Sequence, residues 1–580
     1  MSKAVIRSIG GPVLHARAKG AFRVGEVIEI GARRLPGEVI RLKEEELVAQ
    51  VYEDTTGLRP GDPVYGTGGP LAVRLGPHLL GGIFDGLLRP LDGALDREAL
   101  PRQGGGQFRF RPLATAGQAL GPGSPFGEVP GGGINQLCLL PPQLAGTVES
   151  IAEEGTFAPD TSLCTIRTPA GALREVGFFR HWPVRQARPV LERLPSDEPM
   201  ITGQRILDTL FPVARGGRAA LPGGFGTGKT VLQETLAKWC DADVIVYVGC
   251  GERGNEMAEV LHDFPSLVDP RTGRRLMERT VIIANTSNMP VTAREASIYT
   301  AVTVGEYFRD QGLHVSLLAD STSRGAEALR EVSGRHGELP GEAAYPAYLA
   351  SRLAEFYERA ARVRTLAGGI GSLTIIGAVS PPAGDFSEPV TSHTKRYVGA
   401  FWGLDRERAQ ARFYPAIHPL QSYSEGAGRF ASWWTERGNP DWVAQRERLL
   451  SLLESQADLE RMARIVGKDA LPQAQQLTLL CAELVNESFL RQSAVSPVDR
   501  FCSPERQTAM LRVILRFIEL AEAALERGVA PQTIAELAIL RRLQRMGEEI
   551  GEDRLDRIPA LRADLEAAMA DIEGAPRHAA

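Results

Sequence analysis

The sequence predicts a multidomain α/β protein with an N-terminal β-barrel, an inserted β-rich lobe, a parallel-sheet domain and a C-terminal helical bundle. Three observations support this prediction. At 580 residues the chain is too long for one hydrophobic core. Short apolar runs between glycine turns open the chain, and apolar runs that alternate with helical patterns fill its middle. From about residue 435 onward the pattern is helical.

Residues 1–70 read as short strands punctuated by glycine, such as "AVIRSIGGPVLHA", "EVIEIG" and "GEVIRLKEEELVAQVYE". Turn signals that recur about every ten residues are typical of small antiparallel barrels. We therefore expect a β-barrel in this part of the chain.

Residues 110–185 differ in texture, being rich in glycine and proline with short apolar runs such as "QLCLLPP". The same texture begins upstream, in "RQGGGQFRFRPL" at residue 102. We expect an inserted β-rich lobe. A disordered linker is the alternative that this composition leaves open.

Residues 71–109 and 186–434 are expected to form the parallel-sheet domain. Four β-rich runs lie in the second range: "DVIVYVGC" (243–250), "TVIIANTS" (280–287), "HVSLLADS" (314–321) and "GSLTIIGAVS" (371–380). Helix candidates accompany them, including "TVLQETLAKW" and "MPVTAREASIYTAVTVGEYFRDQG". Apolar runs separated by crossover helices indicate a parallel sheet that is covered on both faces.

Residues 435–580 carry long helical patterns such as "VAQRERLLSLLESQADLERMARIVG" and "TAMLRVILRFIELAEAALERG". We expect a helical bundle whose charged residues form a solvated face.

Bulk composition excludes several classes of function. A net charge of −5 over 580 residues provides no polyanion-binding surface, so nucleic acid is not an expected partner. Six cysteines are scattered without a CxxC pair, which favours reduced thiols over a disulfide or zinc framework. No run of 18 apolar residues occurs, so no segment is expected to span a membrane.

A phosphate-binding loop is the strongest motif in the chain. The stretch "GGFGTGKT" fits the P-loop pattern Gly223-x4-Gly228-Lys229-Thr230. Glycines let backbone N–H groups surround phosphate oxygens, and the following helix N-terminus adds its positive dipole. Lys229 supplies a point charge and Thr230 a hydroxyl for Mg²⁺. The chain has seven lysines against 59 arginines, so a lysine here suggests a specific role; the alternative is a surface loop with a chance lysine.

Acidic residues follow two of the predicted strands. Asp320 ends "HVSLLAD" and is expected to hold the metal through water, although aspartate also ends strands to begin a turn. Glu252 in "VGCGERGNEM" is expected to orient the attacking water, and Arg253 to meet charge on the transferred phosphoryl group. The alternative for this pair is a Glu–Arg contact in a surface turn.

At these residues the sequence resembles the catalytic A subunits of the V-type (A/V-type) rotary ATPases. The resemblance rests on "GGFGTGKTVLQETLAKWCDADVIVYVGCGERGNEM", "LMERTVIIANTSNMPVTAREASIYT", "ADSTSR", "AEALREVSGR" and "AVSPPAGDFSEPVT". It runs from "GGPVLHARAKGAFRVGEVIEIG" to "GKDALP" at 467–472 and so covers most of the chain.

This resemblance implies an N-terminal barrel, a bulge lobe, a RecA-like nucleotide domain and a C-terminal helical domain. It implies that ATP or ADP is held with Mg²⁺, that Arg324 belongs to the phosphate site, and that Tyr414 and Val495 face adenine. The implied loop residues are Gly223, Gly224, Phe225, Gly226, Thr227, Gly228, Lys229, Thr230 and Val231.

The sequence departs from the family pattern at several positions. The family usually has Pro at Gly224, Trp at Gly325, Gly at Ala383, an arginine shortly before "GS" in "GGIGS", and an aromatic residue at Val495. A valine can pack against adenine, but it lacks the stacking contribution of about 0.5–1.5 kcal/mol. Some eukaryotic members have a P-loop cysteine where this chain has Thr227.

The resemblance implies an ATP-hydrolysing or ATP-synthesising subunit in an alternating hexamer with B-type subunits, which supply an arginine finger. Central shaft and peripheral stalk subunits, and a membrane sector that moves protons or sodium, are the further implied partners. Such a chain lies at the cytoplasmic face of the cell membrane. Two alternatives remain: a non-catalytic nucleotide-holding subunit, and another RecA-like hexameric motor such as a transcription-termination helicase or a secretion ATPase.

Overall fold

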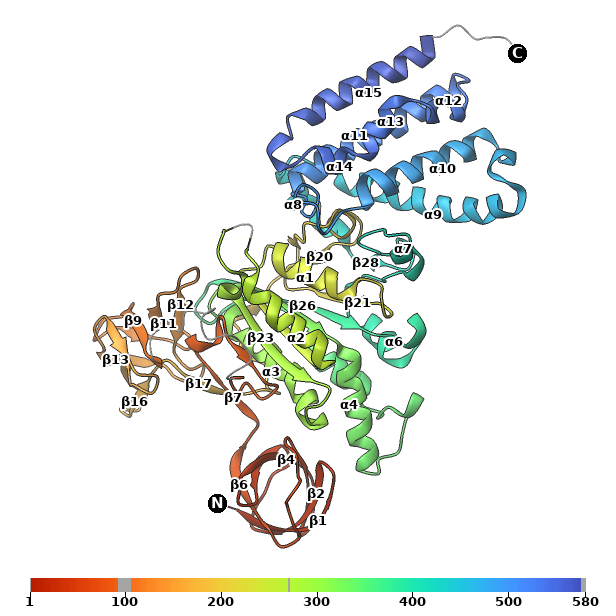
Figure 1. Ribbon diagram of the computed structural model, residues 1–580. Helices are drawn as coiled ribbons and strands as arrows, with labels where there is room; N and C mark the ends of the chain where they lie inside the picture. The colour runs from red at the N-terminus through yellow and green to blue at the C-terminus, as the bar shows by residue number, and fades with distance from the viewer. Residues whose placement is uncertain (1, 92–105, 270–271, 575–580) are drawn as a thin grey trace. The chain divides into compact units, whose positions relative to one another are not determined.

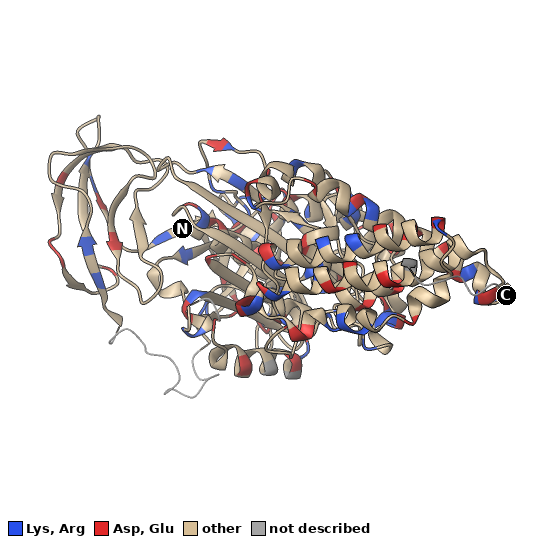
Figure 2. Ribbon diagram, turned by 90° about the horizontal axis from the view of Figure 1, so that it is seen from above, with Lys and Arg blue, Asp and Glu red and all other residues tan. Residues whose placement is uncertain are grey.

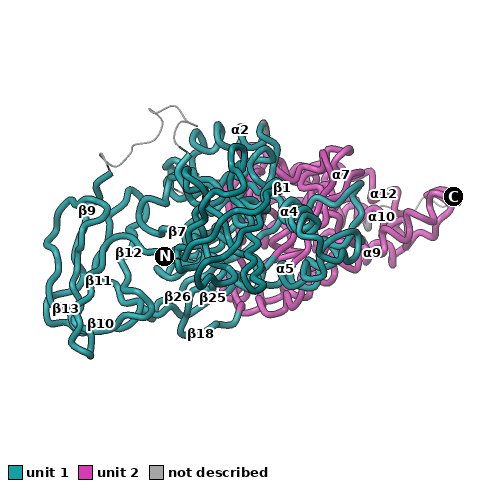
Figure 3. Tube along the Cα trace, turned by 90° about the horizontal axis from the view of Figure 1, so that it is seen from below, with its two compact units in different colours: residues 1–195, 215–218, 242–398 teal, residues 196–214, 219–241, 399–580 magenta. Residues whose placement is uncertain are grey.

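The computed structural model describes residues 2–91, 106–269 and 272–574 (Figure 1). Part of the predicted range 71–109, including residues 102–105 where the glycine-rich texture begins, lies outside the described residues. The chain divides into two compact units (Figure 3). The first contains residues 1–195, 215–218 and 242–398, and the second contains residues 196–214, 219–241 and 399–580.

The first unit begins with a closed six-stranded antiparallel barrel in the order β1-β2-β5-β4-β3-β6 (Figure 1). Alternate side chains point inward and fill it, among them Ile6, Leu14, Ile28, Val39 and Val64. The predicted barrel is therefore confirmed. Its strands are β1 (Lys3–Gly10), β2 (Val13–Lys19), β3 (Glu26–Ile30), β4 (Leu35–Lys43), β5 (Glu46–Val51) and β6 (Pro63–Pro70).

A β-rich lobe follows, built from two four-stranded sheets in the orders β10-β13-β15-β16 and β12-β11-β9-β14. Phe110, Phe126 and Ile166 are fully buried in a core of its own. These residues thus fold as a lobe rather than as a linker. The strands are β9 (Phe108–Pro112), β10 (Ala119–Leu120), β11 (Pro125–Val129), β12 (Gln136–Leu139), β13 (Gly146–Ile151), β14 (Gly155–Phe157), β15 (Cys164–Arg167) and β16 (Leu173–Val176). The chain leaves the lobe through β17 (Arg180–Pro183), which pairs with β7 (Ala72–Leu75).

The first unit also contains the predicted parallel sheet, whose strands pair in the order β26-β24-β22-β23-β8. The first eight residues of β22 are all buried, as expected for a strand covered on both faces. Figure 1 shows α2, α3 and α4 alongside these strands. The strands are β8 (Ile83–Phe84), β22 (Val244–Glu252), β23 (Thr280–Thr286), β24 (His314–Asp320) and β26 (Ile370–Val379), with β25 (Ala361–Arg364) antiparallel to β26 and paired in turn with β18 (Glu192–Arg193). The helices are α2 (Gly254–Asp263), α3 (Val291–Arg309), α4 (Thr322–Arg335), α5 (Leu349–Tyr357) and α6 (Pro389–Lys395).

Helix α3 is buried along almost its whole length, although it carries several hydroxyl residues. Their donors reach backbone carbonyls of other segments: Thr292 donates to Val51 of the barrel at 2.5 Å, and Thr303 donates to Val184 at 3.1 Å. A buried hydroxyl without such a partner would destabilise the fold. These hydrogen bonds therefore account for the burial of polar side chains on α3. The bond from Thr292 also links α3 to the barrel.

The second unit contains β21 (Arg218–Pro222), which pairs in parallel with β27 (Ala400–Phe401) and leads into α1 (Lys229–Trp239). The remaining strands are β19 (Pro199–Met200), β20 (Val213–Ala214) and β28 (Tyr423–Ser424). The helices that follow are α7 (Arg406–Gln410), α8 (Ala431–Glu436), α9 (Trp442–Val466), α10 (Gln473–Val485), α11 (Pro504–Glu526), α12 (Pro531–Ala535), α13 (Ala538–Gln544), α14 (Met546–Glu549) and α15 (Arg557–Gly574).

The C-terminal helical bundle is confirmed, and its central helix is α11. Ser503 caps that helix by accepting a hydrogen bond from the Arg506 amide, and Pro504 occupies its first turn. Leu511, Ile514 and Ile518 lie on one buried stripe, and α11 packs against α10 and α15. Basic and acidic positions are interspersed along the C-terminal helices (Figure 2). In the described part of the chain, no helix has both the length and the hydropathy that a membrane span requires.

Candidate active site

The predicted P-loop lies in the second unit, between the end of β21 and the start of α1. Gly226 and Gly228 have φ angles of 77° and 82°, in the left-handed region that favours glycine. Gly223 is required for space, because a Cβ there would lie 2.6 Å from Thr227 Oγ1 and 2.7 Å from Leu404 Cδ1. The loop backbone can therefore curl tightly ahead of α1, whose first amides have no side-chain cap.

The loop is held by a hydrogen bond from Thr227 Oγ1 to the Gly224 carbonyl at 2.8 Å. A proline at position 224 would offer the same carbonyl, so the glycine retains this hydrogen bond. The glycine differs by giving the unfolded chain more backbone entropy to lose on folding. Phe225 is 90% exposed and Val231 is 46% exposed, so these two predicted nucleotide contacts present apolar surface at the loop.

Tyr414 lies against α1 in the same unit. Its hydroxyl donates to Thr235 Oγ1 at 2.8 Å, and burial raises the pKa of Tyr414 above its ordinary value. The Gln492 amide donates to the Tyr414 carbonyl at 2.7 Å, so the segment that carries Val495 runs beside Tyr414. Val495 is 89% exposed, so its side chain is available to a ligand. The sequence analysis did not identify Thr235 as the partner of Tyr414. The available signal was a hydroxyl residue on the helix that follows the P-loop.

The predicted acids lie at the carboxyl edge of the parallel sheet in the first unit. Glu252 is the last residue of β22 and Asp320 is the last residue of β24, and these two strands pair directly. The Tyr247 hydroxyl lies 3.5 Å from Asp320 Oδ2, and the Ser287 amide donates to the Glu252 carbonyl at 2.9 Å. The structure thus brings the two carboxylates to one edge, as parallel topology requires.

Two arginines accompany these acids. Arg253 is exposed immediately before α2. Arg324 donates to Glu327 at 2.8 Å, and this hydrogen bond is the main reason why the pKa of Arg324 is raised, with Glu252 and Glu256 adding smaller attractions. The Glu252 carboxylate and the Arg324 guanidinium therefore lie close enough to attract each other.

The two predicted metal ligands supply oxygen donors, one in each unit. Among the described residues, no group of three or more His, Cys, Asp or Glu side chains could hold a metal. Thr230, exposed at the start of α1, and the buried Asp320 each offer oxygen, the donor that Mg²⁺ prefers. Mg²⁺ usually takes few protein ligands, and substrate phosphates and water supply the others.

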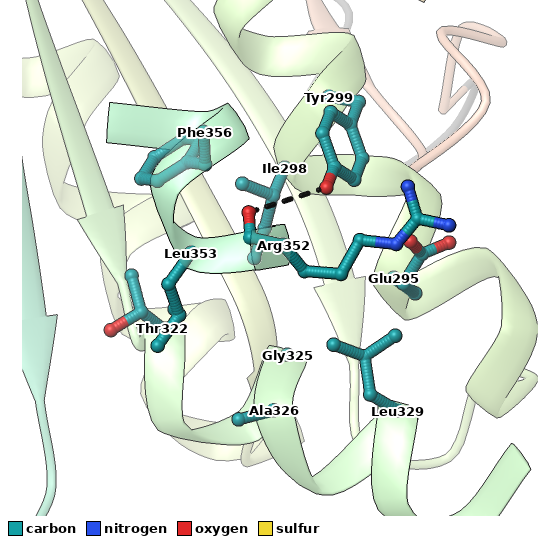
Figure 4. Close-up of a pocket in the computed structure, with 10 residues that line it drawn as sticks. All are labelled: Glu295, Ile298, Tyr299, Thr322, Gly325, Ala326, Leu329, Arg352, Leu353 and Phe356. Carbon is teal, nitrogen blue, oxygen red and sulfur yellow. Dashed lines mark hydrogen bonds between the residues drawn. The ribbon is translucent and has the colours of Figure 1, made fainter. Parts of the chain in front are cut away.

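Two departures from the family pattern have visible consequences. Ala383 has a φ of 54°, so an alanine occupies the left-handed conformation at a position where the family has glycine. Gly325 lies inside α4 and borders a mostly apolar pocket of about 30 Å³ (Figure 4). That pocket is lined by Glu295, Ile298, Tyr299, Thr322, Gly325, Ala326, Leu329, Arg352, Leu353 and Phe356. The absence of a large side chain at 325 thus coincides with unfilled space between α3, α4 and α5.

The chain matches four protein families along its length. The family described as "ATP synthase alpha/beta family, nucleotide-binding domain" matches residues 203–424, and "C-terminal domain of V and A type ATP synthase" matches residues 431–534. "ATPsynthase alpha/beta subunit barrel-sandwich domain" matches residues 98–185, and "ATP synthase alpha/beta family, beta-barrel domain" matches residues 6–68. The nucleotide-binding match includes the P-loop and both acids.

Relatives are similar over nearly the whole chain. The A-type ATP synthase A subunit of Thermococcus onnurineus is 49% identical over 556 residues, covering 93% of this chain and 94% of its own. That of Methanopyrus kandleri is 48% identical over 583 residues and covers 97% of each chain. An A-type ATP synthase A subunit of Methanospirillum hungatei is 49% identical and covers 92% of this chain and 93% of its own.

A solved structure shares the fold. The assembled ATPase EscN from the type III secretion system of enteropathogenic E. coli has a TM-score of 0.65 and 23% identity, covering 88% of this chain and all of that one. At such low identity the likeness concerns the fold alone.

Proposed function

This chain belongs to the family of A-type ATP synthase A subunits, and from that premise we propose that it is the subunit in which ATP is hydrolysed or synthesised. One observation supports catalysis in particular. The chain carries a P-loop together with a glutamate and an aspartate at the carboxyl ends of two paired parallel strands.

In the proposed mechanism the loop and its lysine bind the phosphates. The backbone amides of Gly223–Thr230 and the N-terminus of α1 surround phosphate oxygens, and Lys229 neutralises charge on the β- and γ-phosphates. Tyr414 and Val495 contact the adenine ring. These groups position ATP without forming a covalent bond to it, which suits phosphoryl transfer.

The groups at the sheet edge act on the reacting atoms. The Glu252 carboxylate orients a water for in-line attack on the γ-phosphorus, while Arg253 and Arg324 stabilise the charge that spreads over the equatorial oxygens. In synthesis a terminal oxygen of ADP attacks the phosphorus of phosphate, one phosphate oxygen leaves as water, and the same groups orient the phosphate and that water. Thr230 and Asp320 would hold Mg²⁺, and the ion would supply positive charge to the phosphates.

We propose the partners that the family implies: B-type subunits in an alternating hexamer, shaft and stalk subunits, and a membrane sector that moves protons or sodium. A trans arginine from the B-type neighbour would accelerate hydrolysis by about 10³–10⁵. The proposed location is the cytoplasmic face of the cell membrane. We also propose domain boundaries near residues 70, 110, 185 and 435; the family matches to residues 6–68, 98–185 and 431–534 support those near 70, 185 and 435.

Phosphate release by the chain assembled with its B-type partner tests this proposal. Wild type is expected to turn over ATP, and Glu252→Gln is expected to lower the rate at least about 100-fold with nucleotide binding retained. Equal and negligible rates in both would favour a non-catalytic nucleotide-holding subunit. Stimulation by RNA would favour another hexameric motor instead.

A further inference from the structure

The first turn of α3 places a buried arginine behind the loop that carries Glu252. Arg294 is only 8% exposed, and it lies next to Glu295, which Figure 4 shows on α3. Its Nη2 donates to the Ser287 carbonyl at 3.2 Å, and its Nε has no hydrogen-bond partner among the described residues. One of the five guanidinium donors is thus buried without a partner in the described part of the chain, which is uncommon in native proteins.

The side chain of Arg294 packs directly against Gly251, the residue before Glu252. A Cβ on Gly251 would lie 2.6 Å from both Cδ and Nε of Arg294, and 3.0 Å from the Cβ of Arg324. Gly251 has a φ of 71°, so the turn is also one that favours glycine. The backbone of the turn is therefore held between two arginines.

Ser287 connects Arg294 to Glu252 by a second route. Its carbonyl accepts from Arg294, while its amide donates to the Glu252 carbonyl at 2.9 Å. On the other side, the Arg294 carbonyl accepts from the hydroxyl of Ser297 at 2.7 Å and from the thiol of Cys250 at 3.5 Å. Arg294 is thus linked to the residues on both sides of Gly251.

We propose that Arg294 is a positioning residue that fixes the Gly251–Glu252 turn, and through it the direction of the Glu252 carboxylate, without touching the substrate. An apolar side chain of similar length would fill the space without burying an unsatisfied donor, which costs about 1–3 kcal/mol. The guanidinium fits here because it donates to Ser287 while Cδ and Nε of the same side chain lie against Gly251. This inference rests on the proposed role of Glu252.

The test compares Arg294→Ala and Arg294→Lys with wild type in the complex with the B-type partner. A misdirected Glu252 slows the chemical step, so kcat is expected to fall about 100-fold in the alanine variant and about tenfold in the lysine variant. The KM for ATP is expected to stay within about threefold, because the P-loop is untouched. Methylguanidinium added to Arg294→Ala is expected to restore turnover several-fold, which a merely structural defect would not allow.

Ser297→Ala provides the matched control. It removes a donor to the Arg294 carbonyl but leaves the guanidinium in place, so kcat is expected to remain within about twofold of wild type. If Arg294→Ala does not assemble, Arg294→Lys decides the question. The inference is overturned if kcat of either assembled Arg294 variant stays within about twofold of wild type. It is also overturned if KM for ATP rises by the factor expected for the fall in kcat while kcat is unchanged.

The variant Glu252→Gln distinguishes the proposed role of Glu252 from the positioning role of Arg294. In its background, removing Arg294 is expected to cost nothing further, because the carboxylate that it directs is absent. Full turnover in Glu252→Gln would refute the proposed role of Glu252 itself. An inactive Glu252→Gln beside fully active Arg294 variants would refute the positioning role alone.

Discussion

The substitution Gly223→Ala tests whether the P-loop depends on the tight turn seen in the second unit. The new methyl group would overlap Thr227 Oγ1 at 2.6 Å and the buried Leu404 at 2.7 Å. Overpacking of this kind costs about 1–3 kcal/mol. Displacing Thr227 also weakens its bond to the Gly224 carbonyl, which contributes about 0.5–1.5 kcal/mol. A loss of about 2 kcal/mol in the nucleotide-binding conformation corresponds to roughly 30-fold weaker binding.

Titration of the purified chain with ATP and ADP by calorimetry measures this effect. Gly428→Ala is the matched control, because that glycine lies in the same unit, no atom lies within 4 Å of its added Cβ, and its φ is not positive. The control is expected to bind like wild type. Equal affinity of Gly223→Ala and wild type would refute the assignment of this loop as the phosphate cradle.

Three further predictions concern the second unit. Lys229→Ala is expected to abolish turnover while the melting temperature stays close to wild type; normal phosphate release would show that the loop is misassigned. Val495→Phe is expected to tighten ATP binding about two- to tenfold through stacking, and unchanged affinity would show that residue 495 does not face the base. At about pH 4, Asp208→Asn is expected to lower the free energy of unfolding by about 2–4 kcal/mol, because its amide would face the Gly203 and Gln507 donors. Burial raises the pKa of Asp208 to about 6, so its contribution is present below about pH 4 and is lost as pH rises through 6. The stability of wild type relative to Asp208→Asn, measured in denaturant, should therefore fall over that range; a difference that rises with pH would contradict the assignment.

Much of the fold could be predicted because its signals are local. Strand β22 was recognisable from a continuous apolar run, since both faces of a parallel strand are buried. Helix α11 was recognisable from its apolar stripe. The P-loop was recognisable because glycine spacing and one lysine suffice to define it.

The remainder depends on contacts between residues far apart in sequence. Nothing near Tyr414 indicates that its hydroxyl meets Thr235, 179 positions earlier. Likewise, the contact of Arg294 with Gly251 arises only once α3 packs on β22. The left-handed conformation of Ala383 was also hidden, because alanine gives no local sign of it.

A structure of the chain with its B-type partner, Mg²⁺ and a non-hydrolysable ATP analogue tests the central claim most directly. The account predicts γ-phosphate oxygens within hydrogen-bond distance of Lys229 and the loop amides. It also predicts a water about 3 Å from the Glu252 carboxylate and in line with the γ-phosphorus. An empty loop, or a Glu252 side chain directed away from the phosphate with no such water, would contradict it.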